Sequence, residues 1–305
     1  MSASVLLMAY GSVESVDEMG DFLKDVFRGK PVREATVREF QERYRLFGGR
    51  SPLLDISKRQ AEALEKLLGI PVRVGMRHWH PYIADVVKEM TEPIVGLSLA
   101  PQYSRFSVGE YQHALKTAFS GRIINIDQWH LQPKFLEAWA DRIREGLERH
   151  RPEALLFTAH SVPEAPGDPY AQHLKETREG ILPLIPAVRW DFAYQSASSA
   201  PLKWLGPDVD TKLKELREQG IRKVMAEPIS FICDHAEVLY DLDHLHRKSA
   251  EDLGMTLTRC ESLNDHPLLI QALAAAVRES LAAAVRESLA AAVRESLAAA
   301  VREVL

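Results

Sequence analysis

Short apolar segments rich in β-branched residues recur along this chain, and most of them are separated by longer polar segments with helical periodicity. The apolar segments predict strands over 4–10, 72–76, 93–100, 122–126, 154–159, 188–194, 222–231 and 255–259. The polar segments predict helices over 55–69, 80–91, 107–119, 133–150, 169–184 and 208–219. Nearly continuous apolar strands that alternate with helices are typical of parallel sheets covered by helices on both faces.

The eight predicted strands form two groups of four, and the division between the groups falls near Pro152. We therefore predict an α/β protein of two similar doubly wound lobes of the Rossmann or flavodoxin type, each with a four-stranded parallel sheet. The expected limits are 1–151 for the first lobe and 152–273 for the second lobe, with the active site in a cleft between them.

The C-terminal segment 274–305 is a tandem repeat. The octet AAAVRESL at 274–281 recurs at 282–289 and 290–297 and ends as AAAVREVL at 298–305. These residues are strong helix formers, so we predict a helical tail. Its valines and leucines recur every fourth residue, and such a stripe drifts by about 40° at each step around a straight helix. Two interpretations remain open: an extension of the last domain helix, or an arm for oligomerisation or partner binding.

Composition and charge narrow the class of protein. The chain has 305 residues, 46% of them hydrophobic and 27% charged, which is typical of soluble globular proteins. The net charge of −5, without a basic patch interleaved with aromatic residues, argues against nucleic-acid binding. The two cysteines, Cys233 and Cys260, are too few for a disulfide framework, a four-cysteine metal site or an iron–sulfur cluster.

The cellular location is predicted from the same features. The apolar run at 4–9 is too short for the core of a signal peptide and follows no basic residue. No apolar stretch was expected to reach membrane-spanning length. We therefore expect a cytoplasmic protein in a reducing compartment, without a transmembrane segment.

Two predicted strands end in residues suited to proton and metal chemistry. The strand at 154–159 is followed by His160, and the strand at 222–231 is followed closely by Asp234-His235-Ala236-Glu237. The carboxyl ends of parallel strands meet at one edge of a sheet, where open α/β proteins bind their ligands. A histidine and a carboxylate at that edge favour general acid–base chemistry or metal binding.

Several segments together resemble the ferrochelatase family, and within it the shorter bacterial type that metallates coproporphyrin. The matching segments, in family order, are LLMAYG at 6–11, GGRSPL at 49–54, GMRHWHP at 75–81, LAPQYSRFSVGEY at 99–111, TAHSVP at 158–163, GDPY at 167–170, WLGPDV at 204–209 and ISFICDHAEVLYDLD from 229. The resemblance covers nearly everything up to about residue 270 and leaves out the octet tail.

The resemblance implies the chelatase fold and the insertion of Fe(II) into coproporphyrin III, with release of two protons. It also implies that porphyrin and Fe(II) are substrates, that no cofactor is permanently bound, and that the enzyme is a monomer. Two alternatives remain: a ferrochelatase acting on protoporphyrin IX, and a non-catalytic carrier of haem or porphyrin. A sister chelatase for cobalt or nickel is disfavoured, because such enzymes usually have a second histidine where this chain has Glu237.

The resemblance assigns catalysis to His160 and Glu237. Neutral imidazole suits the removal of pyrrole protons near pH 7. Glu237 and Asp241 are four residues apart and are expected on one helix face as a carboxylate ladder. By resemblance, Glu237 faces His160 across the porphyrin site and Asp241 lies behind Glu237. Asp234 and Glu237 also have the spacing of a helix capping box. Where relatives carry a further acid one turn on, this chain has Leu245, so an outer metal site there is in doubt.

Tyr10 is the main residue-level argument for the coproporphyrin type. By resemblance, a tyrosine here faces the metal from the side opposite the histidine, so the candidate metal-contacting set is His160, Glu237, Tyr10 and Asp241. The glycine that follows, Gly11, is expected to permit a sharp turn and the close approach of a planar ligand.

The expected substrate contacts are basic and aromatic. Arginine binds carboxylates bidentately, and coproporphyrin carries four propionates. By resemblance Arg43 and Ser51 bind propionate, whereas Arg45 and Arg50 are interpreted as solvated surface. Phe27-Arg28-Gly29 stands where relatives have Arg-Arg-Gly, so one propionate contact is expected to be missing or moved.

The remaining candidates line the expected cleft. Arg77 and His78 follow a strand and are assigned to the cleft wall rather than to a His-x-His metal pair. Tyr111 and Trp204 are assigned to the apolar walls around the macrocycle, with plain core packing as the alternative for Trp204.

Overall fold

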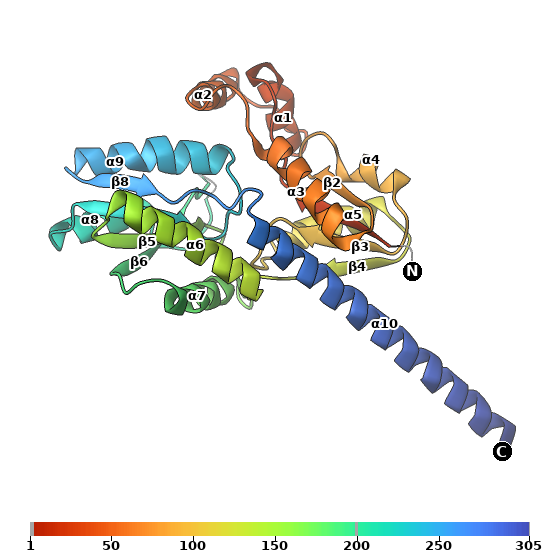
Figure 1. Ribbon diagram of the computed structural model, residues 1–305. Coiled ribbons are helices and arrows are strands. Elements are labelled where there is room, and N and C mark those ends of the chain that lie inside the picture. The colour runs from red at the N-terminus through yellow and green to blue at the C-terminus, as the bar shows by residue number, and fades with distance from the viewer. Residues whose placement is uncertain (1–2, 199–200, 305) are drawn as a thin grey trace.

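The computed structural model describes residues 3–198 and 201–304, with side chains of the last helix described as far as residue 295. Its described part contains two four-stranded parallel sheets, which confirms the predicted fold class (Figure 1). The first has the order β2-β1-β3-β4 and the second the order β6-β5-β7-β8. The strands are β1 (Ser4–Ala9), β2 (Val72–Met76), β3 (Ile94–Ser98), β4 (Ile123–Ile126), β5 (Ala154–His160), β6 (Trp190–Gln195), β7 (Lys223–Pro228) and β8 (Thr256–Arg259).

Helices connect the strands on both faces of each sheet. They are α1 (Met19–Val26), α2 (Glu34–Arg45), α3 (Leu53–Leu68), α4 (Ile83–Val86), α5 (Val108–Ala118), α6 (Pro133–His150), α7 (Tyr170–Ile181), α8 (Val209–Glu218), α9 (Arg247–Asp252) and α10 (Pro267–Val304). A π-helix, η4 (Glu237–His246), precedes α9. Short 3₁₀ turns are η1 (Val16–Glu18), η2 (Val87–Glu89) and η3 (Leu182–Leu184). The single helix predicted over 80–91 is therefore only the short α4 followed by η2.

Both sheets have the same topology, so their functional edges are equivalent. The central strand β1 pairs in parallel with β2 on one side and with β3 on the other, and β5 pairs in the same way with β6 and β7. In the first sheet the chain adds β2 on one side of β1 and then β3 on the other side; in the second sheet it adds β6 and β7 on the two sides of β5 in the same way. Side chains that follow these strands are thereby placed at a topological switch point, where doubly wound sheets bind ligands.

The two lobes exchange helices. Helix α6 follows the strands of the first sheet, yet it packs against α7, η3 and β7 of the second lobe. Helix α10 follows the last strand of the second sheet, yet it packs against α3, β3 and β4 of the first lobe, as well as against α6. Figure 1 shows α6 lying along the second sheet and α10 running beside the first. The limits expected near residues 151 and 273 stay a prediction.

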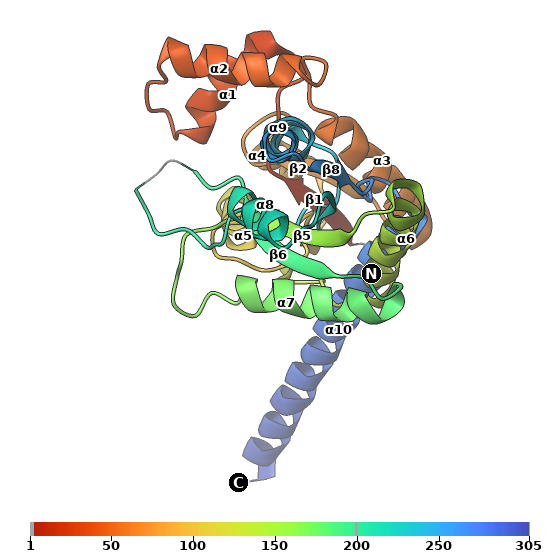
Figure 2. The same ribbon diagram turned by 90° about the vertical axis from the view of Figure 1, so that its left-hand side faces the viewer.

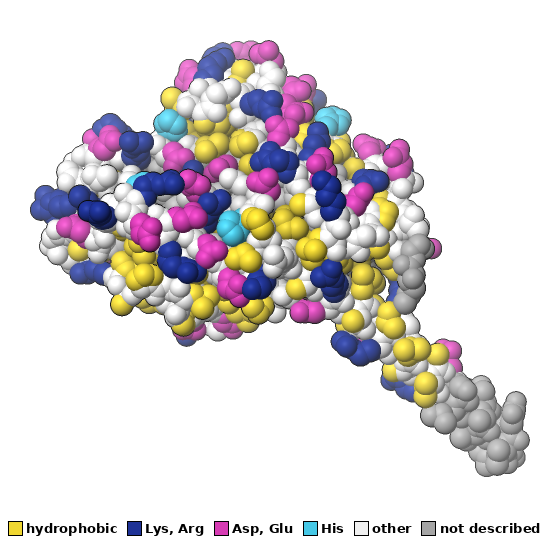
Figure 3. Space-filling model, viewed as in Figure 1, with side chains coloured by type: hydrophobic (Ala, Val, Ile, Leu, Met, Phe, Trp, Pro, Cys, Tyr) yellow, Lys and Arg dark blue, Asp and Glu magenta, His cyan; other side chains and the backbone are white. Residues whose placement is uncertain are grey.

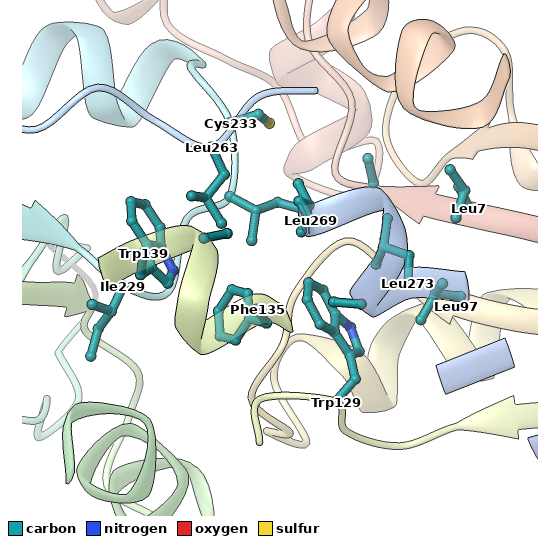
Figure 4. Close-up of a cluster of buried hydrophobic side chains, with 14 of the residues drawn as sticks. Leu7, Leu97, Trp129, Phe135, Trp139, Ile229, Cys233, Leu263, Leu269 and Leu273 are labelled. Atoms are coloured by element: carbon teal, nitrogen blue, oxygen red, sulfur yellow. The ribbon is translucent and has the colours of Figure 1, made fainter. Parts of the chain in front are cut away.

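The exchanged helices build a core that is continuous across both lobes. Trp129, Phe135 and Trp139 come from the start of α6 and the loop before it, and Leu269 and Leu273 come from α10; all are buried. Figure 4 shows them between residues of the first sheet and the chain after β7. Because these side chains bury apolar surface from both lobes at once, they join the lobes into one packed unit.

The octet tail continues α10 as one uninterrupted helix, as the extension of the last domain helix predicts. A role in oligomerisation or partner binding stays a prediction. Val277 is fully buried and Leu281 packs against the shared core, whereas Leu289 is 61% exposed. Figures 1 and 2 show the helix leaving the body of the protein. The side chains of the last octet lie outside the described residues.

The expectation about membrane-spanning length was wrong for this helix. Residues 267–295 are long and apolar enough to cross a membrane by length and composition, although 39% of the most apolar part of this stretch is buried inside the protein. A partly buried core helix meets the same criterion, so this is weak support for a span. Figure 3 shows basic and acidic side chains interspersed over the described part of the face drawn.

Candidate active site

His160 is the last residue of β5, and hydrogen bonds fix both its backbone and its ring. Its backbone N–H donates to Ser230 Oγ (3.0 Å), and its carbonyl accepts from the Tyr170 hydroxyl (3.0 Å). Its Nδ1 bonds to the carbonyl oxygen of Ser161. Since Nδ1–H is the donor to that carbonyl, the other ring nitrogen, Nε2, is the one available for chemistry.

Glu237 is brought to His160 from the neighbouring strand. The chain leaves β7 at Pro228, runs through a loop and starts the π-helix η4 at Glu237. Glu237 Oε1 lies 3.4 Å from His160 Nε2, and the two side chains are 45% and 30% exposed. The predicted pairing of a strand-end histidine with this carboxylate is present, at the switch point of the second sheet.

Each member of this pair shifts the titration of the other. Removal from bulk water lowers the pKa of His160, but the negative charge of Glu237 and its hydrogen bond outweigh that effect, so the pKa is raised above its ordinary value. Removal from water likewise raises the pKa of Glu237, but the charge and hydrogen bond of His160 outweigh it and the pKa is lowered. The arrangement therefore favours an imidazolium–carboxylate pair in the free enzyme.

Asp234 does not cap the helix, so the proposed capping box is wrong. The residue before η4 is Ala236, which provides no side-chain cap. The Asp234 carboxylate instead accepts from Ser262 Oγ (2.7 Å) and Asn264 Nδ2 (3.1 Å), two residues of the segment that leads into α10. These partners hold Asp234 away from the N-terminus of η4 and leave Glu237 free to face His160.

A second histidine, His235, contacts the same carboxylate and was not singled out from the sequence. Its Nε2 lies 3.6 Å from Glu237 Oε2, and its Nδ1 is 2.9 Å from the Cys233 carbonyl oxygen. The Phe231 ring lies between the two histidines, 6.1 Å from His160 and 4.6 Å from His235. The sequence signal that could have identified His235 was the Asp-His-x-Glu motif. We interpreted this motif as the start of a helix, whereas in the structure His235 precedes the helix η4.

Asp241 lies one turn beyond Glu237 in η4. A π-helix bonds residues five apart, so residues 237 and 241 still share one side of it. Ser196 Oγ donates a hydrogen bond to the Asp241 carboxylate. Burial and the negative charge of Glu237 raise the pKa of Asp241. Leu245, in place of a further acid, is 45% exposed. A metal-binding role for Asp241 stays a prediction.

Tyr10 follows β1 at the switch point of the first sheet. The His78 backbone N–H donates to the Tyr10 carbonyl (2.8 Å), and the two rings lie 4.7 Å apart. Removal of water around the hydroxyl, followed by the negative charge of Glu237, raises the pKa of Tyr10 to about 12. The charge of Glu237 on the second lobe is thus one cause of the raised pKa of Tyr10 on the first lobe.

Gly11 lies against the loop after β2, and the expected close approach of a planar ligand stays a prediction. Its φ is +102°, and a Cβ there would lie 2.8 Å from the backbone nitrogen of Trp79. Glycine thus allows the loop after β2 to pack directly on the loop after β1. This contact positions Arg77, His78 and Tyr10 side by side.

A pocket of about 400 Å³ adjoins Tyr10 on the first lobe, and charged or polar side chains form most of its wall. Its lining residues are Asp25, Arg28, Arg77, His78, Glu110, His113 and Ala114. Arg77 is paired with Glu110, which also lies 3.6 Å from Arg28. His78 Nδ1 is 2.7 Å from Asp25 Oδ1. Asp25, Arg28 and Glu110 were not predicted as site residues, because no strand end marks them in the sequence.

Arg43 connects the two lobes. It is paired with Glu39 of its own helix, α2, and its guanidinium lies 4.8 Å from the Phe40 ring centre and 5.0 Å from that of Tyr240 in η4. It therefore stands beside the helix that carries Glu237 and Asp241. Ser51 is only 3% exposed, and its Oγ accepts from the backbone N–H of Leu53. Propionate binding by Arg43 and Ser51 stays a prediction.

The two aromatic candidates differ in exposure. Tyr111 is 8% exposed and packs in a core cluster with residues of β1 and β3. Trp204 is half-buried and pairs through its backbone with Pro163, just after β5. Arg50, interpreted as surface, is exposed and paired with Asp55. The substrate roles of Tyr111 and Trp204 stay predictions.

The fold places the protein in a structural class. SirB from Bacillus subtilis with Fe³⁺ superimposes with a TM-score of 0.57 at 13% identity, covering 92% of this chain and 96% of that chain. CbiX, described as the terminal enzyme of sirohaem biosynthesis in denitrifying bacteria, gives a TM-score of 0.51 at 12% identity over 92% of this chain and 99% of that one. The likeness is one of fold: two parallel α/β lobes of the chelatase type.

Sequence comparison then shows the family. The ferrochelatase family model matches residues 2–281. A ferrochelatase of Deinococcus radiodurans is 40% identical over 297 residues, covering 90% of this chain and 94% of the relative. A coproporphyrin III ferrochelatase of Geobacillus kaustophilus is 35% identical over 300 residues, covering 90% and 95%. The chain belongs to the ferrochelatase family and is an enzyme of that family, whose substrates are a porphyrin and a metal ion.

Proposed function

We propose that this enzyme inserts Fe(II) into coproporphyrin III and releases two protons, and that His160, Glu237 and Tyr10 carry the reaction. The observation that supports it most is the His160–Glu237 pair, 3.4 Å apart at the end of β5. Insertion replaces two pyrrole protons by one Fe²⁺ ion, so the site must accept protons beside the ring nitrogens.

Each residue has a distinct part in the proposed reaction. Once His160 is in its neutral form, a pyrrole proton moves to its Nε2, while the Nδ1 bond to Ser161 keeps the ring oriented. The carboxylate of Glu237 stabilises the imidazolium that results and passes the proton onward, supported by His235. Tyr10 faces the metal from the first lobe. If the site holds the macrocycle out of plane, the nitrogen lone pairs become exposed to the metal. Favourable binding of the propionates would offset the free-energy cost of that distortion.

The proposed substrate is supported by the arginines near the site and by the relatives. Arg28 and Arg77 lie in the pocket beside Tyr10, and Arg43 stands over η4. Guanidinium groups at separate positions suit a porphyrin with four propionates. Relatives named coproporphyrin III ferrochelatase are 33–35% identical, but others are named simply ferrochelatase. Protoporphyrin IX is therefore the second candidate substrate, and a non-catalytic porphyrin carrier the alternative outside catalysis.

We further propose that the enzyme holds no permanent cofactor and no iron–sulfur cluster, and that it works as a cytoplasmic monomer. Iron–sulfur clusters require about four cysteine ligands, and this chain has two, both buried. Iron analysis and sedimentation of the purified protein test these points. A bound iron–sulfur cluster, or a dimer that persists on dilution, would contradict them.

The decisive experiment is anaerobic metallation with purified protein. Fe(II) is supplied with coproporphyrin III or with protoporphyrin IX, and the visible spectrum of the porphyrin reports insertion. We expect turnover of coproporphyrin III and little turnover of protoporphyrin IX. Preference for protoporphyrin IX would keep the reaction and reject the substrate, whereas binding of both without turnover would favour the carrier.

The same assay tests the residue roles. His160→Ala is expected to lower kcat by at least about 100-fold while porphyrin binding persists, because general acid–base groups contribute about that much. Glu237→Gln is expected to lower kcat strongly as well. His150→Ala, at the end of α6, is the matched control and should keep full activity. Full activity in the His160 or Glu237 variant would reject the assignment.

A further inference from the structure

A second group of metal-ligating side chains lies outside the active site, where the two lobes meet. His130 belongs to the turn between β4 and α6, and His173 and Glu176 belong to α7. Each can offer one ligand atom, and the three atoms lie within 4.8 Å of one another. No sequence pattern groups them, because 43 positions separate His130 from His173.

The three side chains are held in place by their elements. His173 and Glu176 are three apart on α7 and share one face of that helix. The His130 ring lies against the His173 ring, with centroids 4.2 Å apart and planes 24° from parallel. His130 Nε2 is 2.9 Å from Glu176 Oε2. The three side chains therefore lie close together before any ion arrives.

The histidines are buried and the carboxylate reaches solvent. His130 is 1% exposed and His173 7%, whereas the Glu176 side chain is 33% exposed. Among the residues that the structure describes, His130 Nδ1 is buried without a hydrogen-bond partner. Imidazole binds metals in its neutral form, and burial disfavours the charged imidazolium.

We propose that His130, His173 and Glu176 form a divalent metal site of the Zn²⁺ class that ties the two lobes together. Two imidazole nitrogens and one carboxylate oxygen are a ligand set that zinc accepts, with water in the fourth position on the exposed side of Glu176. The proposal is independent of the insertion reaction, which uses other residues.

Binding moves a proton within the His130 ring. The hydrogen bond between His130 and Glu176 is replaced by two metal bonds, and the proton moves from Nε2 to Nδ1, which has no partner among the described residues, so the neutral ring keeps its one proton. The backbone N–H of Tyr103 contacts His173 Nδ1 at 3.2 Å, and this long hydrogen bond opens as the ring turns to the ion. Affinity is thus expected to weaken at acidic pH, where a protonated imidazole must first lose its proton, and to be lower than that of four-ligand structural zinc sites.

The position of the group suggests what the ion does. Next to it, Gln102 of the first lobe donates through Nε2 to Thr177 Oγ1 of α7 at 3.0 Å. An ion held between the turn before α6 and helix α7 would add a strong link at the same seam. The ion is therefore expected to stabilise the folded protein rather than to take part in insertion.

The test titrates Zn²⁺ into protein without porphyrin, using a His160→Ala/Glu237→Gln background that disables the active site. We expect one equivalent to bind and to raise Tm. Adding His173→Gln or Glu176→Gln should weaken binding at least about 10-fold, as loss of a metal-supporting group does. His150→Gln on the same background is the matched control and should bind as the background does.

Circular dichroism is used to check that each variant is folded. Glu176→Gln changes a partly exposed side chain, so this variant is expected to fold and to keep the test decisive. The proposal is rejected if the background protein binds no equivalent of Zn²⁺. It is also rejected if His173→Gln and Glu176→Gln leave the affinity unchanged. Co²⁺ gives a second readout, since its visible absorption reports nitrogen and oxygen ligands.

Discussion

The charge shared by His160 and Glu237 sets the pH range in which the candidate site can accept a proton. The pKa of His160 is raised because the carboxylate 3.4 Å away outweighs the removal of water around the imidazole. A raised pKa keeps the ring protonated to higher pH. The form that accepts a pyrrole proton is therefore populated only as the pH rises through that raised pKa.

Glu237→Gln removes this charge and is predicted to move the acid limb of the kcat profile to lower pH, along with lowering kcat itself. The reason is that removal of water, which lowers the pKa of His160, is then opposed only by weaker effects. Metallation rates between pH 5 and pH 9 measure the limb. Glu148→Gln, on the exposed side of α6, is the control and should leave it in place; an unmoved limb in Glu237→Gln would refute the coupling.

For individual residues, the sequence allowed us to predict the proposed catalytic pair but not the side chains that contact it. His160 and Glu237 were predictable because both follow buried strands at one sheet edge. His235 was not, since a helix starting at Asp234 would have turned it away from Glu237. The helix begins at Glu237 instead, and Asp234 is held by Ser262 and Asn264, which no local pattern reveals.

Among the elements, the loops after β1 and β2 depend on one glycine. Gly11→Ala is predicted to lower the free energy of unfolding by about 1–3 kcal/mol, because φ is +102° and the added Cβ would meet the Trp79 backbone at 2.8 Å. It should also lower metallation, since the same contact positions Arg77 and His78. Urea unfolding and the metallation assay measure the two effects.

Gly20→Ala provides the control for this substitution. Gly20 lies in α1, and its added Cβ would meet nothing within 4 Å. It should therefore stabilise the protein by up to about 1 kcal/mol, as alanine does in a helix. A Gly11→Ala protein as stable as the wild type would show that the loop contact is not restrictive.

The outer part of α10 is predicted to be dispensable. Deleting 282–305 should leave metallation unchanged and alter the free energy of unfolding by about 1 kcal/mol or less, because the chief loss among described residues is the Arg122–Ser288 hydrogen bond. Deleting 267–305 should instead abolish folding, since it removes Leu269, Leu273 and Val277 from the core. Loss of turnover in a soluble, folded 282–305 deletion would contradict this.

Strand positions were predictable to within a few residues, but several helices were not. Most of α2 is polar, with Tyr44 its only buried residue, so it lacked the apolar periodicity on which the prediction relied. The π-helical form of η4 depends on tertiary packing and has no sequence signal that we recognised.

For the whole molecule, the shared core predicts that both lobes unfold together. Leu273→Ala is expected to cost about 2–5 kcal/mol and to shift circular dichroism and tryptophan fluorescence transitions equally, because Leu273 is fully buried between the lobes. Leu289→Ala, at a residue 61% exposed on the same helix, should change stability by about 0.5 kcal/mol or less. Two separate transitions would contradict a single packed unit.

The two-lobed α/β architecture was visible in the alternation of strands and helices, but the exchange of α6 and α10 was not. Periodicity shows that a helix has an apolar face; it does not show which sheet covers that face. Chain order suggested that each helix stays with the strands before it, and here the packing across both lobes decides otherwise.

This exchange has a consequence for the order of events on the ribosome. The first sheet is complete once β4 has been made, yet α10, which covers it, emerges about 150 residues later, or roughly ten to thirty seconds at ordinary rates of translation. Helix α6 likewise waits for β7. Neither half can close its core while the chain is still growing, so the nascent protein depends on staying protected until its last helix is released.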